Sequence, residues 1–253
     1  MTVRELYRVL NERIPKALSR DWDNDGAMCV PDGDREVRRV LITLDVTEAA
    51  VNRAVEVSAD LILSHHPMIF KGLKQVNEEN AIARKTLTLI RSGISVLSFH
   101  TRLDAVSGGV NDTLASLLGL SEIEPFGAEQ MGRIGNLPES MSAEAFAQQV
   151  KETLGAPTVL LSDSGRAVRR VALLGGEGED SIGEAACAGA DLYLSGRLGY
   201  HPMTDAPEGG MSMIEAGHFY TEYPVCETLR SFLLEIDPTV QADIFNSNVI
   251  RSV

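Results

Sequence analysis

The stretch "REVRRVLITLDVTEAAVNRAVEVSADLILS" (residues 35–64) returns without a gap 131 positions later as "RAVRRVALLGGEGEDSIGEAACAGADLYLS" (residues 166–195). Twelve of the thirty aligned positions are identical. In both copies an apolar run of strand length is followed by a turn, an alanine-rich stretch of helical period and a second apolar run. This order predicts a β-α-β unit with a parallel strand pair in each copy. The sequence therefore indicates an internal duplication.

The likeness extends to both sides of this stretch, through two helices and a strand that ends in a histidine. The matching segments are residues 2–10 and 142–150, 92–104 and 209–222, and 113–118 and 228–233. We therefore expect one α/β repeat over residues 1–125 and a second over residues 126–253. The Gly/Pro-rich stretch at 125–140 shows no period, so we interpret it as the connector between them.

Composition narrows the classes of function. The chain has 253 residues, of which 44% are hydrophobic, and a formal net charge of −13. This charge disfavours broad contact with nucleic acid or anionic lipid. No apolar run approaches the roughly 18 residues of a membrane span, and residues 1–20 lack the apolar core of a signal peptide. The three cysteines are odd in number and have no CxxC spacing, which favours a cytoplasmic location.

Histidines follow the predicted strands and form the main candidate site. The five are His65, His66, His100, His201 and His218. His100 and Asp104 are four residues apart, and so are His218 and Glu222; on a helical turn this spacing places both side chains on one face. Such a pair is common on solvated surfaces, but two at equivalent places in a duplication, together with adjacent histidines, favour a metal site. A lone histidine such as His201 is more often a hydrogen-bonding residue.

Other chemistries find less support. There is no G-x-S-x-G nucleophile motif, and Ser64 beside His65 lacks the context of a catalytic triad. The segment "LLGGEGED" (residues 173–180) has the glycines of a phosphate-binding loop, but its acidic residues would repel phosphate and no Walker lysine follows. We interpret it first as a tight turn and second as a substrate-phosphate loop.

Several blocks, in order along essentially the whole chain, resemble the Nif-three-like family of dinuclear-metal hexameric proteins, the GTP cyclohydrolase 1 type 2 homologues. The blocks are "DWDNDG" (21–26), "LSHHPMIF" (63–70), "HTRLDAVSGGVND" (100–112), "GADLYLSGRLGYH" (189–201) and "EAGHFYTE" (215–222). The resemblance implies two divalent ions, zinc, iron or manganese, and a bridging role for Glu222, with His100 beside the site. The implied metal ligands are His65, His66, Asp104, His218 and Glu222.

The resemblance also implies a fold of two intertwined α/β repeats with mixed sheets, no inserted middle domain, and a toroidal homohexamer with its metal sites facing an inner cavity. The implied activity is metal-dependent hydrolysis of a nucleotide or phosphorylated small molecule, with His100 or His201 moving protons. Arg197, where the family often has an acidic residue, is our candidate for contact with a substrate phosphate or carboxylate. The alternative is a non-catalytic, ring-shaped metal-binding scaffold or regulatory protein.

The second copy differs from the first at the histidine pair. His65 and His66 precede Pro67 where a predicted strand stops, and the equivalent positions hold Gly196 and Arg197. Adjacent residues within a strand point to opposite faces, but at a strand end both rings can converge on one cluster. We expect His65 and His66 to bind different ions.

Overall fold

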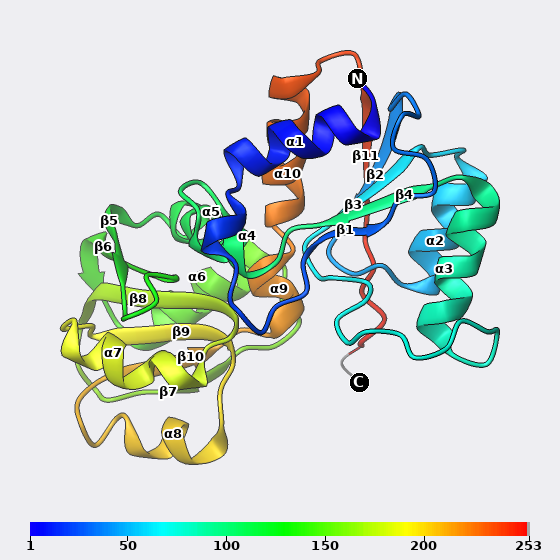
Figure 1. Ribbon diagram of the computed structural model, residues 1–253. Helices are drawn as coiled ribbons and strands as arrows, with labels where there is room; N and C mark the ends of the chain where they lie inside the picture. The colour runs from blue at the N-terminus through cyan, green and yellow to red at the C-terminus, as the bar shows by residue number, and fades with distance from the viewer. Residues whose placement is uncertain (252–253) are drawn as a thin grey trace. The chain divides into compact units, whose positions relative to one another are not determined.

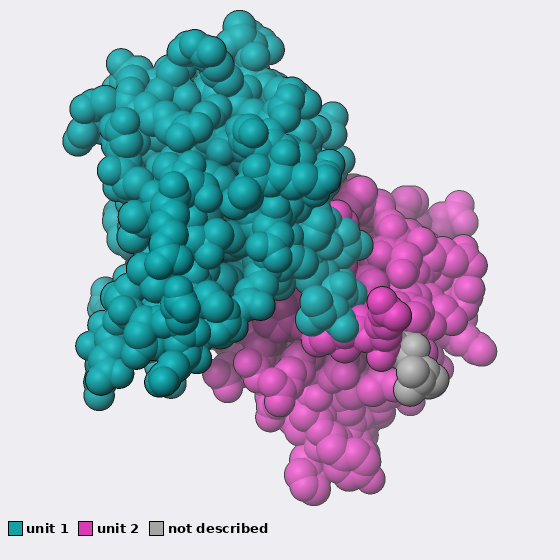
Figure 2. All heavy atoms as spheres, turned by 90° about the vertical axis from the view of Figure 1, so that its right-hand side faces the viewer, with its two compact units in different colours: residues 1–106, 225–249 teal, residues 107–224, 250–253 magenta. Residues whose placement is uncertain are grey.

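The computed structural model describes residues 1–251, which form two compact units (Figures 1 and 2). Unit 1 comprises Met1–Val106 and Val225–Val249, and unit 2 comprises Ser107–Pro224 and residues 250–251. Each unit therefore joins segments that are distant in sequence. Among the described residues, no helix is long and apolar enough to cross a membrane.

Unit 1 is built on a five-stranded sheet of order β1-β4-β3-β2-β11, in which only β1 runs antiparallel to its neighbour. Helices α2 and α3 pack together on one face, and α10 packs against β2 and β11 (Figure 1). Its elements are α1 (Val3–Arg13), η1 (Lys16–Leu18), β1 (Gly26–Cys29), β2 (Arg39–Thr43), α2 (Glu48–Glu56), β3 (Leu61–Ser64), α3 (Ala81–Ser92), β4 (Ser95–Ser98), α4 (Thr101–Ala105), α10 (Val225–Ile236) and β11 (Gln241–Phe245).

Unit 2 has a six-stranded sheet of order β5-β6-β8-β9-β10-β7. Strands β8, β9 and β10 are parallel, and the other three pair antiparallel with their neighbours. Its elements are α5 (Val110–Leu117), β5 (Ser121–Phe126), β6 (Gly132–Met141), α6 (Ala143–Leu154), β7 (Leu160–Ser162), β8 (Val168–Glu177), η2 (Glu179–Ser181), α7 (Ile182–Cys187), β9 (Leu192–Arg197), α8 (Tyr200–Asp205), β10 (Ser212–Glu215) and α9 (His218–Glu222). The predicted α/β fold with mixed sheets is confirmed.

The two β-α-β units predicted from the duplication are β2-α2-β3 and β8-α7-β9, each with a parallel strand pair. One interaction explains why both copies keep the same residues at the ends of this unit. Asp60 Oδ2 accepts hydrogen bonds from the backbone N–H groups of Arg38 and Arg39, at 2.9 and 3.0 Å. Asp191 makes the same two bonds in unit 2, at 3.0 and 2.8 Å. The common Ala-Asp-Leu thus fastens the turn before the second strand to the common Val-Arg-Arg-Val.

The connector predicted at 125–140 is wrong, because most of it lies in the antiparallel strands β5 and β6. Its glycines serve close packing. A Cβ on Gly132 would lie 2.2 Å from a ring carbon of Phe126, and one on Gly135 would lie 2.8 Å from the carbonyl oxygen of Ser121. The irregular register of β6 between Asn136 and Met141 hides the alternation expected of a strand.

Candidate metal centre

Three histidines gather at the ends of two parallel strands in unit 1. Strand β3 ends at Ser64, immediately before His65 and His66, and β4 ends just before the segment that carries His100. One ligand nitrogen from each ring lies within 4.8 Å of the others. The ring centroids are 4.8–5.5 Å apart. Because the strand has ended, the two adjacent rings converge, as the sequence predicts.

The buried His65 is held in one tautomer by its backbone partner. Its Nδ1 lies 2.9 Å from the carbonyl oxygen of Phe99. A carbonyl only accepts, so Nδ1 carries the proton and donates it, and in the neutral ring Nε2 keeps its lone pair. Nε2 lies 3.6 Å from Oδ1 of the buried Asp104. An imidazole Nε2 beside a carboxylate oxygen, with Nδ1 bound to a carbonyl, is a common arrangement of divalent-metal ligands.

Carboxylates orient the other two rings. His66 Nδ1 lies 2.7 Å from Asp45 Oδ1, and His100 Nδ1 lies 2.9 Å from Asp23 Oδ1. Burial alone would raise the pKa of Asp23, but hydrogen bonds from His100 and Thr101 outweigh it and lower that pKa to about 2. Asp23 is therefore a permanent anion at neutral pH, and each ring presents Nε2 as its second nitrogen.

A buried ion pair fixes the segment that carries His100 and Asp104. Arg102 Nε donates to Asp25 Oδ2 at 2.9 Å, and both side chains are fully buried. The same Oδ2 accepts the backbone N–H of His100 at 3.2 Å. Breaking a buried ion pair is costly, so this contact holds α4 firmly at the end of β4.

In unit 2, His218 and Glu222 form the predicted pair on one face of a short helix. His218 Nε2 lies 3.0 Å from Glu222 Oε2, one turn apart on α9. Glu222 is buried, whereas the side chain of His218 is 45% exposed. A buried carboxylate beside an accessible imidazole again fits a divalent ion. The pair predicted at the equivalent place in unit 1 was His100 with Asp104. There the structure pairs His100 with Asp23 and places Asp104 beside His65 instead.

Glycines seat α9 on strands β8 and β9, against which it packs. A Cβ on Gly176, at φ +70°, would lie 2.1 Å from Glu222 Oε1. A Cβ on Gly196 would lie 2.5 Å from Thr221 Oγ1 and 2.7 Å from the Cα of His218. Gly196 occupies the position equivalent to His65, so the second copy has no room there for any side chain. This close packing explains why the second copy has no histidine at the position of His65. The position of His66 holds Arg197, whose exposed side chain is under no such constraint.

The predicted catalytic residues of unit 2 lie at its surface. Arg197 ends β9 with its side chain 71% exposed and its Nη1 3.5 Å from Glu177 Oε1. His201 is exposed on α8, its ring centroid 5.5 Å from that of Tyr200. Within residues 1–251, no cluster of three or more possible metal ligands includes His201. The catalytic roles of these two residues and of His100 stay predictions.

Two residues that orient the histidines, Asp23 and Asp45, were not predicted. Asp23 lies in the quoted block 21–26, and Asp45 follows β2 at the position equivalent to Gly176. Neither shows a short-range spacing to the histidine it contacts, since they are 77 and 21 residues apart in sequence. The one sequence signal for Asp45 is its position just after a predicted strand of the duplicated unit, where functional side chains often lie.

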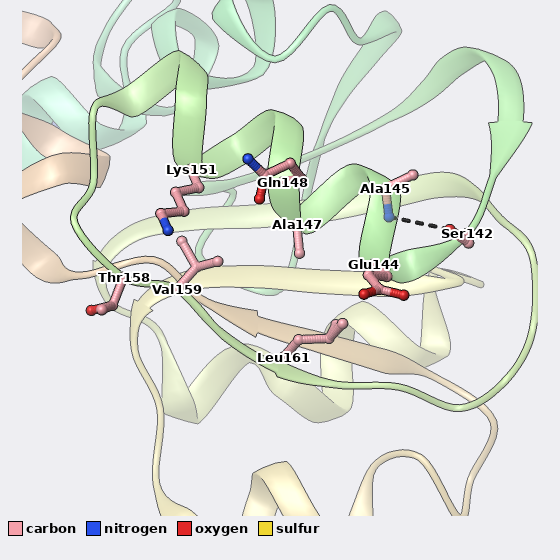
Figure 3. A pocket seen from close by; sticks show the side chains of 9 residues that line it. All are labelled: Ser142, Glu144, Ala145, Ala147, Gln148, Lys151, Thr158, Val159 and Leu161. Carbon is pink, nitrogen blue, oxygen red and sulfur yellow. Dashed lines mark hydrogen bonds between the residues drawn. The ribbon is translucent and has the colours of Figure 1, made fainter.

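A separate hollow of about 610 Å³ lies in unit 2, between α6 and residues 158–161 (Figure 3). Its floor includes Val159 and Leu161, and Lys151 and Glu144 line it from the helix. Ser142, the N-cap of α6, accepts the N–H of Ala145 at its rim. Its lining contains neither histidine nor cysteine, so it does not resemble the metal-ligand cluster.

Comparison with known proteins identifies the family of this chain. A family model described as Duf34/NIF3 (NGG1p interacting factor 3) matches residues 1–252. The chain belongs to this family. A Clostridium perfringens protein named GTP cyclohydrolase 1 type 2 homolog is 32% identical over 232 residues, covering 89% of this chain and 88% of that protein.

Two further relatives of this Duf34/NIF3 protein also align over most of the chain. A Lactococcus lactis protein of the same name is 34% identical over 227 residues, covering 86% of this chain and 87% of its own. The crystal structure of a Staphylococcus aureus protein superposes with a TM-score of 0.90 at 26% identity, covering 100% of this chain and 99% of that one. The Nif-three-like fold predicted from the sequence is confirmed.

Proposed function

We propose that this protein is a metal-dependent hydrolase that binds two divalent ions and acts on a nucleotide or phosphorylated small molecule. The ligands would be His65, His66, Asp104, His218 and Glu222, with Glu222 bridging and His65 and His66 on different ions. The single observation that carries the proposal is the convergence of His65, His66 and His100, whose Nδ1 atoms are each held by an oxygen acceptor. Five ligands shared by two ions leave coordination positions for water and substrate.

Two bound ions would supply a water of lowered pKa and would polarise the substrate. The chain supplies the positioning and the proton transfer. Asp23 holds the Nδ1 proton of His100, so proton exchange with a reacting group would take place at Nε2. Arg197 is exposed and only loosely paired with Glu177, which leaves its guanidinium able to bind a substrate phosphate or carboxylate. His201 is a second, exposed proton donor or acceptor.

The names of the Clostridium perfringens and Lactococcus lactis relatives make GTP the first substrate to test, with hydrolytic opening of its imidazole ring. The experiment compares turnover of GTP and a panel of phosphoesters by the wild type, by Glu222→Gln and by Glu152→Gln. Glu152 is an exposed glutamate of α6, so its replacement is a matched control. We expect turnover by wild type and control, and a loss of at least tenfold in Glu222→Gln. Equal turnover by all three proteins would contradict the proposal.

We also propose that the chain self-associates into a toroidal homohexamer. Large apolar side chains on the surface of unit 2 support self-association, notably Tyr200, which is 78% exposed, and Leu160, which is 54% exposed. Light scattering on the purified protein measures the assembly mass directly. A ring that binds two ions per chain but turns over no substrate would favour the non-catalytic scaffold instead.

A further inference from the structure

Two exposed aromatic side chains lie beside the histidine cluster of unit 1. Trp22, the only tryptophan of the chain, is 64% exposed, and Phe70 is 44% exposed. Their ring centroids are 6.1 Å apart. Both rings meet His100 edge-on, at centroid distances of 6.3 and 6.2 Å. The three rings form a continuous face, which we call the aromatic face.

The aromatic face is held by specific contacts and is not a chance cluster. Asp23, next to Trp22, fixes His100 through Nδ1. The side-chain amide of Asn24 donates to the backbone carbonyl of Ile69, the residue before Phe70, and so ties the two loops together. The three rings therefore keep their spacing, with Trp22 and Phe70 open to solvent and the side chain of His100 18% exposed.

Open aromatic surface of this kind suits a flat ligand. Exposed apolar area costs about 25 cal/mol per Å², so a cluster containing Trp and Phe gains from being covered. Aromatic pairs favour edge-on and offset-stacked contacts at centroid distances of roughly 4.5–7 Å, and a planar ligand can make the same contacts with the exposed Trp22 and Phe70. The exposed Lys71 and Lys74 follow Phe70 on the same loop and offer positive charge to an anionic substituent of such a group.

We propose that Trp22, Phe70 and His100 form a subsite that stacks the planar heteroaromatic ring of the substrate, a nucleobase or a ring of similar size. The subsite rests on the proposed function for its purpose, because it places the ring next to His100. It narrows the substrate class from phosphorylated small molecules in general to those that carry such a ring. A sugar phosphate without a base would lack its principal contact.

The single tryptophan gives a direct test, because its fluorescence reports on Trp22 alone. We titrate the full-length protein with guanosine 5′-monophosphate and, separately, with ribose 5-phosphate. We expect saturable quenching by the nucleotide and none by the sugar phosphate. Since stacking on one aromatic side chain contributes strongly to base binding, Phe70→Ala should raise the Kd about fivefold to a hundredfold. Phe70→Tyr should preserve binding, and so should Val76→Ala, a truncation of an exposed apolar residue on the same loop.

Three results would overturn the subsite: no saturable quenching, equal quenching by ribose 5-phosphate, or an unchanged Kd in Phe70→Ala. A fourth is that acrylamide fails to quench Trp22 in the free protein, since the face would then be covered by another chain. Repeating the titration with a chelator and with added Mn²⁺ separates this proposal from the metal site. Ring binding that depends on Phe70, in a protein that binds no metal, supports the subsite and contradicts the proposed hydrolase. Metal binding without ring binding contradicts the subsite and leaves the metal site supported.

Discussion

The replacement Gly176→Ala tests whether the close packing of α9 on β8 shapes the metal centre. Gly176 has φ +70°, and an added Cβ would lie 2.1 Å from Glu222 Oε1 and 3.3 Å from His218 Nε2. Because ordinary carbon–oxygen contacts exceed 3 Å, the Glu222 carboxylate must move by about 1 Å or more. The left-handed backbone costs an alanine roughly 1–2 kcal/mol. The forced repacking of a buried side chain adds about 1–3 kcal/mol.

Gly155→Ala is the matched control. Gly155 ends α6 with φ +62°, and nothing lies within 4 Å of its added Cβ. It should therefore lose only the roughly 1–2 kcal/mol of backbone strain and bind metal like the wild type. Gly176→Ala should unfold more easily than the control in urea. Replacing a residue that positions a metal ligand typically lowers metal affinity about 10- to 100-fold, so we expect a loss of this size in Gly176→Ala. Competition with a chromophoric chelator measures the affinity. Metal affinity equal to that of Gly155→Ala would refute the role assigned to Gly176.

Three further predictions concern stability and metal linkage. Asp60→Ala leaves two backbone N–H groups without an acceptor and should cost about 2–4 kcal/mol in urea unfolding; Asp191→Ala should cost nearly as much, and a near-zero cost for both would refute the shared-turn account. Burial alone would raise the pKa of Asp60. Hydrogen bonds from Arg38, Arg39 and Arg35 outweigh burial and lower that pKa. The pKa of Asp60 is lower in the folded than in the unfolded chain. The wild type should therefore exceed Asp60→Asn in unfolding free energy by a constant amount well above pH ~4, and this difference should disappear as the pH falls through the lowered pKa. A difference in unfolding free energy that does not change with pH would contradict this. Adding Zn²⁺ or Mn²⁺ at about 100 times its Kd should stabilise the chelator-treated protein by about 2.7 kcal/mol per site, and an unchanged Tm argues against binding to the folded chain.

Local pattern accounts for what the sequence could predict. The β-α-β units follow from alternating apolar runs and an alanine-rich helical period, and their shared letters mark the contact of Asp60 with Arg38 and Arg39. The His218–Glu222 pair depends only on helical spacing, and it lies as predicted, at 3.0 Å. The strand-end positions of His65, His66 and His100 predict a cluster, which the fold brings together, and the family motifs add which of these residues are expected to bind metal.

Long-range contact explains what the sequence could not predict. Asp23 orients His100 from 77 residues away, and no spacing rule reaches that far. The sequence predicts a connector where the hairpin β5–β6 lies, because Gly132 and Gly135 look like loop residues in isolation. In the fold they are glycines because Phe126 and the backbone of Ser121 press against them. Residue type at such positions is set by a neighbour that only the folded chain reveals.

The most direct test of the central claim is the number of metal ions per chain in protein purified without added metal, measured by elemental analysis. We predict two divalent ions per chain in the wild type and in Glu152→Gln, and a clear reduction in His65→Ala and in Glu222→Gln. Protein that carries no metal under native conditions, or variants that retain the full wild-type complement, would contradict the dinuclear centre.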